Sequence, residues 1–444
     1  MANQKSLDRL HKLINDPAKI KNKNCTNNFT GINLECADLS LCDLNDINFS
    51  EAILRDAYLI CANLKRSNFS NSDLSHANLS GAIMWFAHLN NVNLKSANLR
   101  EISLRGANLK DANLENANLC RSEITDAQLI QANFTKANLI CTNLRNTNLT
   151  DANFSYAQLD EANISEANLT NANFSYANLT DVNLKDSNLK GANLSKINLV
   201  RGQLNRANLE GANLEGANLE GANLSDTNLN YAKLMNANLN HVNFRGVKIN
   251  YATELDDKWY LVWNIVNHGA YGKKLNGVDL ESADLKGANM GNANLADANF
   301  RSANFRYANL SNANLTNSKL TNTNLTDVNL IEANLTNSDM QGANLSNTLL
   351  FNAILTGALL NEAKLLKAQL CNAELSNAKL KMANLMDANL KNAKLLKADL
   401  REINLEGAEL EGAIFGENLG ITEEMKQELV KRGAIIQDRG EARV

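Results

Sequence analysis

The sequence of 444 residues has one proline and few aromatic residues, which form 5% of the chain. Proline makes up about 5% of average sequences, so its scarcity argues against a loop-rich globular enzyme and against proline-rich linkers. No segment approaches the roughly 18 apolar residues of a membrane span. Residues 5–16 lack the apolar core of a signal peptide. We therefore expect neither secretion nor a membrane location.

The cysteines show no sign of a disulfide framework. Seven of them, an odd number, are scattered without any C-x-x-C spacing, at Cys25, Cys36, Cys42, Cys61, Cys120, Cys141 and Cys371. Scattered, unpaired cysteines are typical of free thiols in a reducing compartment. The sequence therefore predicts a cytoplasmic protein.

Residues that carry catalysis or bind cofactors are isolated along the chain. None of the five histidines has metal-ligand spacing to a cysteine or another histidine, and no GxSxG, GxxxxGK or HExxH motif occurs. Lysine and arginine number 44 against 48 aspartates and glutamates, with both signs interspersed. A nucleic-acid binder would show a basic stripe, and a protein that imitates DNA would show a dense acidic one. We expect no catalytic site, cofactor, metal or direct nucleic-acid binding.

What the sequence does contain is a repeat of five residues. From Phe29 to Ile249 every fifth residue is Leu, Phe, Ile or Met, at 45 positions without exception, and from Leu275 to Phe415 the same holds at 29 positions. We name this residue i. A small residue, usually alanine, stands two positions earlier, at i−2. Internal periodicity of this kind predicts a solenoid.

The repeat also predicts the shape of one coil. Residues i−2 and i share a side of an extended segment, and the next inward residue follows at i+3, so the chain must bend once in every five residues. Two phenylalanine triplets recur at intervals of 20, namely Phe29, Phe49, Phe69 and Phe134, Phe154, Phe174. Stacked aromatic rings need the same face of successive coils. One coil therefore spans four repeats and has four sides, with no room for a pore or ligand inside.

The repeat resembles that of a known family. Runs such as residues 207–224, ANLEGANLEGANLEGANL, resemble the A(N/D)LXX repeat of the pentapeptide-repeat family. The resemblance implies an all-β solenoid, a right-handed quadrilateral β-helix. Most members of that family have no known activity, a minority bind topoisomerases as DNA mimics, and some act in developmental signalling through protein contacts. The family therefore implies no catalytic residues.

Five segments follow from the register. They are a capping helix segment at 1–28, a first β-helix at 29–249, a helical spacer at 250–274, a second β-helix at 275–415, and a capping helix with a tail at 416–444. The spacer carries the apolar spacing of a helix and resembles the helical spacer of long cyanobacterial family members. Trp259 and Trp263 are expected to cover an open end of a coil stack, with a hinge or docking helix as the alternative. Thr422 is expected to cap the last helix.

One candidate binding site lies on the first β-helix. Trp85 and Phe86 occupy outward positions, i+1 and i+2, where most repeats have small polar or charged residues. Lys65 and Arg105 lie one coil to either side of Trp85, and Arg66 lies beside Phe86. This arrangement predicts a cation–π ladder. It either only covers Trp85 or forms a hot spot for protein binding.

A second candidate lies on the other β-helix. Ile331, Phe351 and Cys371 form one outward apolar column, and Leu366 and Met386 form another on the neighbouring side. Three residues at i−1 add to the same coils, namely Leu349, Ile354 and Leu359. Such a surface predicts an interface, for example self-association, or else reflects drift of the repeat from Asn to Leu.

The most direct functional interpretation is a non-enzymatic, cytoplasmic scaffold or regulator that binds an unidentified protein, with homo-oligomerisation as an open alternative. A DNA mimic that binds a type II topoisomerase is the first rival hypothesis. An enzyme with an unrecognised site is the second.

Overall fold

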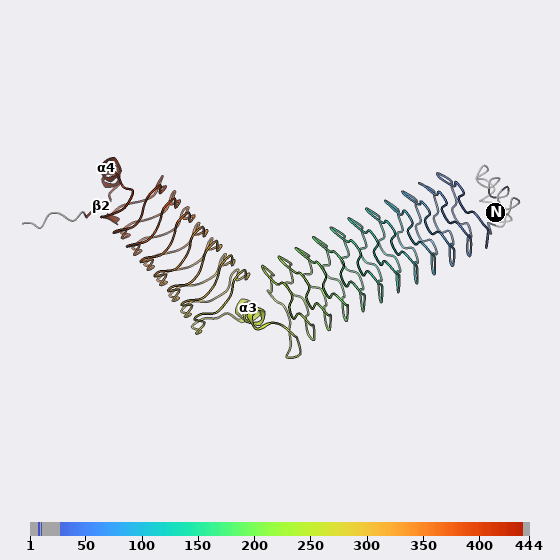
Figure 1. The fold of residues 1–444 in the computed structure, drawn as a ribbon, viewed down its shortest axis with the longest axis horizontal. Coiled ribbons are helices and arrows are strands. Elements are labelled where there is room, and N and C mark those ends of the chain that lie inside the picture. Colours follow the sequence, from blue (N-terminus) through green and yellow to red (C-terminus); the bar gives the residue numbers. More distant parts are fainter. Residues whose placement is uncertain (1–7, 9, 11–26, 438–444) are drawn as a thin grey trace, which may run out of the picture. The chain divides into compact units, whose positions relative to one another are not determined.

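A computed structural model of the protein describes residues 8, 10 and 27–437 (Figure 1). The chain forms two compact units, Met1–Asp256 and Asp257–Val444, and each is described here by itself. Most of the expected N-terminal capping helix lies outside the described residues. Within it, Asp8 and Leu10 are helical, and the side chain of Leu10 is buried.

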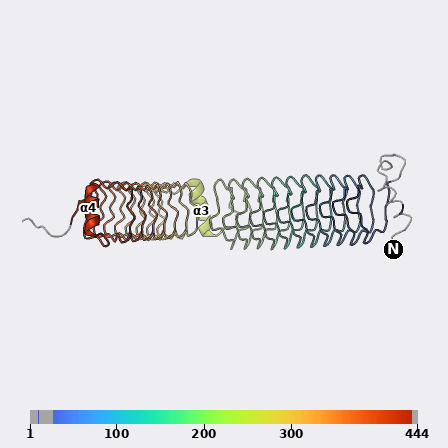
Figure 2. The ribbon, with the colours of Figure 1, turned by 90° about the horizontal axis from the view of Figure 1, so that it is seen from above.

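The first unit is a stack of coils held by parallel β-bridges (Figure 2). Residues at i−1 pair with residues 20 positions later, beginning with Asn28 and Asn48. The N–H of Phe29 donates to the carbonyl of Asn48 at 2.7 Å, and the equivalent bond recurs along the stack. The predicted coil of four repeats is therefore confirmed.

Each corner of a coil is a tight turn. The N–H at i+3 donates to the carbonyl at i, as from Ile32 to Phe29 at 3.2 Å. Residue i+2 has a positive φ even where it carries a large side chain, for example 63° at Leu41 and 57° at Phe86. A positive φ at this place is the mark of a type II turn. The left-handed conformation is thus required by the corner and is not reserved for glycine.

The core follows the repeat. Side chains at i and i−2 point inward and are buried, and the second phenylalanine triplet stacks face to face. The ring centroids lie 4.6 Å apart between Phe134 and Phe154, and 4.7 Å apart between Phe154 and Phe174. Asparagines at i−1 connect the coils: the Asn98 amide donates to Asn78 Oδ1 at 3.0 Å, while Asn98 Oδ1 accepts the N–H of Arg100. These amides satisfy corner N–H groups that no β-bridge reaches.

The first ladder extends beyond the boundary expected at Ile249. Lys233 pairs with Glu254, where the regular interval would give Thr253, so one extra residue enters the coil here. The bulge exposes Tyr251 almost completely, and Thr253 anchors the segment by donating from its hydroxyl to the Leu229 carbonyl at 2.9 Å. The one-residue break in the repeat is therefore absorbed at the end of the first unit.

The second unit begins with helix α3, Asp257–His268. Its buried residues are Trp259, Val262 and Ile265, whereas Trp263 is half-buried and its ring lies 5.2 Å from that of His268. Of the two tryptophans expected to cover a coil stack, Trp259 is buried and Trp263 is half-buried, and the buried Ile265 was not predicted from the sequence. Gly269 follows with a φ of 76°, and a first coil starts at Ala270, five residues before the expected Leu275. Bridges then run from Lys274–Asn294 to Asp399–Leu419.

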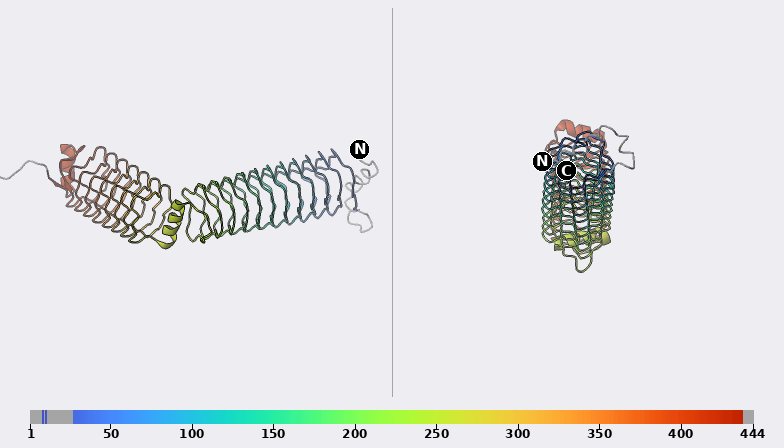
Figure 3. Two further views of the ribbon diagram at one scale, coloured as in Figure 1. Left: turned by 60° about the horizontal axis from the view of Figure 1, so that its bottom comes forward. Right: turned by 90° about the vertical axis from the view of Figure 1, so that its right-hand side faces the viewer.

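The C-terminal end of the second unit is closed by three short elements. Strand β1, Ile414–Phe415, pairs in parallel with β2, Ile435–Ile436, and helix α4, Glu423–Lys431, lies between them in sequence (Figure 3). The Thr422 hydroxyl caps α4 by accepting the N–H of Met425, and Leu429 is buried. The Arg432 guanidinium donates to the carbonyl of Leu405 at 2.8 Å. The cap thus bonds backbone groups of the last coil, after which the described residues form no further coil.

Candidate functional site

The side of the first unit that carries Trp85 is built by the repeats centred on Leu44 and on every twentieth residue up to Phe244. We name the outward residues of these repeats the Trp85 face. Trp85 is 38% exposed and Phe86 is 58% exposed. The corner places both outside the core, because i+1 and i+2 form the turn between two sides of the coil.

Two contacts fix the aromatic pair. The Trp85 indole N–H donates to the Ser103 hydroxyl at 2.6 Å, and the Lys65 Nζ lies 4.4 Å from the indole centroid. The Phe86 ring covers Gly106: a Cβ at that residue would lie 2.5 Å from the ring. The aromatic pair is therefore held in place while much of its surface stays accessible, as expected of an anchor for a partner.

The predicted cation–π ladder is present on one side of Trp85 only. Lys65 lies over the indole as expected. The Arg105 side chain instead pairs with Asp126, with Nε 3.7 Å from the carboxylate. Arg66 forms two hydrogen bonds with Asp46, at 2.7 and 2.6 Å, instead of covering Phe86. A carboxylate attracts a guanidinium more strongly than an exposed ring does, which explains both differences.

Ion pairs between neighbouring coils continue along the Trp85 face. Arg145 pairs with Glu166 at 3.0 Å, and Arg206 makes two hydrogen bonds with Asp186. The Arg206 guanidinium lowers the pKa of the Asp186 carboxyl, and that carboxylate raises the pKa of Arg206. A shallow hollow lies next to Trp85, lined by Arg105, Thr125, Asp126, Arg145, Asn146 and Glu166. The face is therefore a charged, uneven surface around one aromatic pair.

The second candidate surface is less exposed. Ile331, Phe351 and Cys371 are half-buried, as are Leu366 and Met386. Burial is the main cause that raises the pKa of the Cys371 thiol. All five residues stand at i+1, a corner position at which most side chains of the repeats are half-buried.

Between Ile331 and Met386, the large hydrophobic side chains with more than a third of their surface exposed are Ile354 and Met382. Ile354 is one of the residues at i−1 that the sequence added to this surface, whereas Met382 lies at i+2, outside the predicted set.

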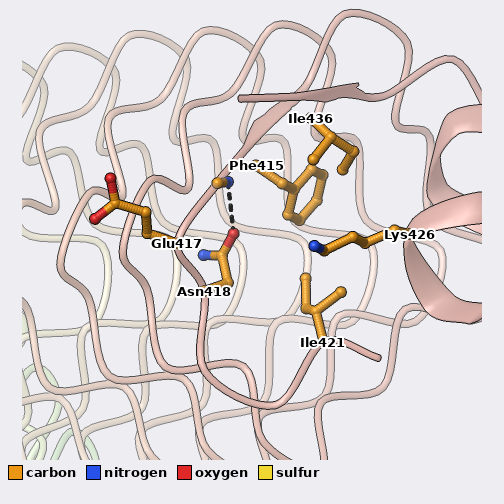
Figure 4. Close-up of a pocket in the computed structure, with 7 residues that line it drawn as sticks. Phe415, Glu417, Asn418, Ile421, Lys426 and Ile436 are labelled. Atoms are coloured by element: carbon orange, nitrogen blue, oxygen red, sulfur yellow. Dashed lines mark hydrogen bonds between the residues drawn. The ribbon is translucent and has the colours of Figure 1, made fainter. Parts of the chain in front are cut away.

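A hollow at the end of the second unit lies between the last coil and α4 (Figure 4). Its polar groups are bonded to the protein itself. Asn418 accepts the N–H of Gly416 at 2.7 Å and donates to the carbonyl of Ala398 at 3.2 Å. Lys426 pairs with Glu423 at 2.8 Å, and Glu417 lies 3.8 Å from Lys397. We therefore assign this hollow to the C-terminal cap.

The described residues also bear on metal binding and on membrane insertion. Among these residues, no group of three or more His, Cys, Asp or Glu side chains is arranged to hold a metal ion. Within the same part of the chain, no helix has the length and apolar character that a membrane span requires.

The sequence contains a signal for the contacts of Arg66, Arg105 and Trp85 that were not predicted from it. Asp46 stands 20 positions before Arg66, and Asp126 stands 21 positions after Arg105. With four repeats per coil, these spacings place each carboxylate beside its arginine. Ser103 stands 18 positions after Trp85, a spacing that side-chain hydrogen bonds elsewhere in the stack also use.

Two cyanobacterial proteins of known structure are similar to this chain in sequence. HetL, a pentapeptide repeat protein involved in heterocyst differentiation regulation from the cyanobacterium Nostoc sp. strain PCC 7120, is 32% identical; the match covers 55% of this chain and 98% of HetL, with a TM-score of 0.30. Rfr23, a pentapeptide repeat protein from the cyanobacterium Cyanothece 51142, is 35% identical over 23% of this chain and 64% of Rfr23, with a TM-score of 0.11.

QnrB1, a plasmid-mediated fluoroquinolone resistance protein, is 19% identical over 40% of this chain and 94% of its own, with a TM-score of 0.24. A search of curated proteins found no match.

The family model gives the decisive match. The model for pentapeptide repeats, in 8 copies, matches residues 28–59, 47–85, 87–126, 127–165, 162–199, 203–240, 274–306, 308–347, 353–392 and 383–417. These ranges cover most of both β-helices, and the family folds as right-handed quadrilateral β-helices, in agreement with the four-sided coil. The chain belongs to the pentapeptide-repeat family.

Proposed function

We propose that this chain is a non-enzymatic scaffold or regulator that binds a protein partner through the Trp85 face of its first unit. The observation that carries the proposal is the exposure of Trp85 and Phe86, side by side and held in place by Ser103, Lys65 and Gly106. Aromatic side chains surrounded by arginines are typical of the residues that dominate binding energy at protein interfaces. The cytoplasm is the compartment that free thiols favour.

The charge distribution argues against the rival hypothesis of a DNA mimic. The Trp85 face carries seven basic and seven acidic residues. The side with the largest acidic excess, on the repeats centred on Leu39 and every twentieth residue, carries six acidic and three basic ones. Eleven coils at about 4.8 Å span about 53 Å, over which B-DNA would present about 30 negative charges. A net charge of about three is an order of magnitude short of that.

Catalysis is the weaker alternative. The core is filled by side chains at i and i−2, and the hollow beside Trp85 is open and lined by groups already paired in Arg105–Asp126 and Arg145–Glu166. A reaction site needs a cleft that can exclude water. An activity abolished by one exposed substitution would favour this alternative.

A capture experiment with a matched control tests the proposed function. The wild-type chain, Trp85→Ala/Phe86→Ala and Tyr156→Ala/Tyr176→Ala are immobilised, and proteins retained from native extract are quantified. Tyr156 and Tyr176 form an exposed, stacked aromatic pair on another side of the same unit, with centroids 5.1 Å apart. We expect the partner to be lost by the first variant and kept by the second. Equal retention by all three proteins, each with wild-type circular dichroism, would refute the proposal.

A further inference from the structure

The first six coils of the Trp85 face carry charges of both signs. Going along the stack, the column at i+2 reads Asp46, Arg66, Phe86, Gly106, Asp126 and Asn146. The column at i+1 places Trp85 beside Arg105 in the next coil. A line between the Phe86 and Gly106 coils divides these six coils into two halves of three. When one copy of the face is turned end to end against another about this line, each charge lies opposite a neutral residue or a charge of opposite sign.

We propose that this part of the Trp85 face, residues 43–146, pairs with the same face of a second copy of the chain, antiparallel, about a two-fold axis between the Phe86 and Gly106 coils. This proposal rests on the function proposed above and names the partner. An axis in the plane of the interface and perpendicular to the stack brings each column against the same column of the partner. Trp85 then faces Arg105, Arg66 faces Asp126, and Phe86 faces Gly106.

The facing groups suit one another chemically. Arg66 and Asp126 form an ion pair twice, once on each side of the axis, and Arg105 lies over the indole of Trp85 as a cation over an aromatic ring. Because each Phe86 ring covers the Gly106 of its own chain, the two Phe86 rings meet at the axis. In all three outward columns, i−1, i+1 and i+2, no two like charges face each other across these six coils.

The charges concerned remain accessible within one chain. The side chain of Arg66 is 59% exposed and that of Asp126 is 45% exposed, although each has a partner in a neighbouring coil. An exposed carboxylate has lone pairs for a second cation, and a guanidinium has five N–H donors. Pairing with a second copy therefore extends the existing ion pairs into a network without breaking them.

The second copy fits better than an unrelated surface because the spacing is shared. Both partners present rows about 4.8 Å apart, so matching groups stay in register over the whole overlap. A helix, with a pitch of about 5.4 Å, drifts out of register with such rows. Six coils span about 29 Å and the three extended residues of one side about 10 Å, so the contact covers about 300 Å² per partner, less than the roughly 800 Å² of a standard stable interface. The expected dimer is thus weak and depends on concentration.

A charge-reversal experiment tests both the partner and the register. Self-association of the full chain is measured by sedimentation velocity from about 1 μM to about 1 mM. Arg66→Glu places two pairs of acidic residues opposite each other in its own dimer, and Asp126→Arg places two pairs of basic residues opposite each other. We expect each single variant to associate at least about tenfold more weakly than the wild type. In a mixture of the two variants both pairs are complementary again, so the mixture should regain association.

Arg206→Glu is the matched control. Arg206 pairs with Asp186 on the same face as Arg66 does with Asp46, but it lies outside the six coils, so its reversal should leave association unchanged. Three results would overturn the inference: a wild-type chain that stays monomeric throughout, a mixture that stays dissociated, or a control that weakens association as much as Arg66→Glu does. A monomeric chain that still captures another protein through Trp85 would leave the proposed function standing.

Discussion

The outward hydrophobic residues of the two units behave differently. In the first unit, Phe86 lies between Gly106 and an arginine that has turned toward Asp46, so its ring stays 58% exposed. In the second unit, Phe351 lies between Ile331 and Cys371 and is half-buried. The comparison teaches that exposure in this fold depends first on the corner position: Phe86 stands at i+2, where most side chains are exposed, and Phe351 stands at i+1, where most are half-buried. Neighbours 20 residues away that are small or engaged elsewhere, such as Gly106 and Arg66 beside Phe86, leave an outward hydrophobic residue still more accessible.

Hydrophobic residues at the ends of the second unit are buried by helices. In the second unit, α3 buries Trp259 at the start and α4 buries Leu429 at the end. Uncapped coils would expose both the core and a row of unpaired backbone groups. The helices therefore account for the large apolar residues outside the repeats, while the Trp85–Phe86 pair has no such structural role.

The largest effect should follow from removing a stacked core ring from the first unit. Phe154→Ala deletes the middle ring of a fully buried stack and should lower the free energy of unfolding by about 3–5 kcal/mol. Tyr156→Ala, two residues away and half-exposed, should change it by less than about 1 kcal/mol. Denaturant unfolding measures both changes. Equal losses would mean that the inward and outward positions are not distinguished as described.

Two glycine corners provide the next comparison. Gly106 and Gly211 have φ values of 64° and 67°, but only at Gly106 would a Cβ meet the Phe86 ring. Gly211→Ala should cost about 1 kcal/mol for the left-handed backbone alone. Gly106→Ala should cost about 1–2 kcal/mol more, because the Phe86 ring must move. Thermal denaturation compares the two variants, and equal costs would show that the Phe86 ring does not rest on Gly106.

Truncating one phenylalanine on each candidate surface sharpens the contrast between the units. Phe351→Ala should lower the free energy of unfolding by about 1–2 kcal/mol, since its ring is half-buried. Phe86→Ala should lower it by less than about 1 kcal/mol and should still impair partner binding, which Phe351→Ala should leave intact. Binding lost with Phe351→Ala and kept with Phe86→Ala would move the site to the second unit.

The smallest effect concerns pH. Hydrogen bonds from Arg401 lower the pKa of the Asp399 carboxyl, and Arg206 does the same for Asp186. A pKa lowered by folding stabilises the protein above the ordinary value near 4, and this stability is lost as the pH falls further.

Asp399→Asn should therefore lower the melting temperature at pH 7 by less than about 2 °C and have no effect near pH 2. Asp399 is buried whereas Asp186 is exposed to about a third, so Asp186→Asn should have the smaller effect. Calorimetry at both pH values tests this, and an equal effect at both would contradict the assigned role of ionisation.

Much of the fold could be predicted from the sequence because a strict repeat leaves few alternatives. The inward residues, the four sides and the bridges at i−1 all follow from the period of five and the phenylalanine intervals of 20. The bridge from Lys233 to Glu254 and the coil that starts at Ala270 could not be predicted. In the first case the apolar residue is shifted by one position, and in the second case it is replaced by alanine. The prediction that Arg66 and Arg105 lie over aromatic rings is wrong, because each guanidinium pairs with a carboxylate in a neighbouring coil.

The central claim is that binding occurs at the Trp85 face of the first unit and not on the apolar columns of the second. Photocrosslinking tests this directly, with a photoreactive phenylalanine analogue placed at residue 86, 156 or 351 in otherwise wild-type protein. We predict protein adducts from position 86 and only background from positions 156 and 351. Adducts from position 351 with none from position 86 would contradict the account.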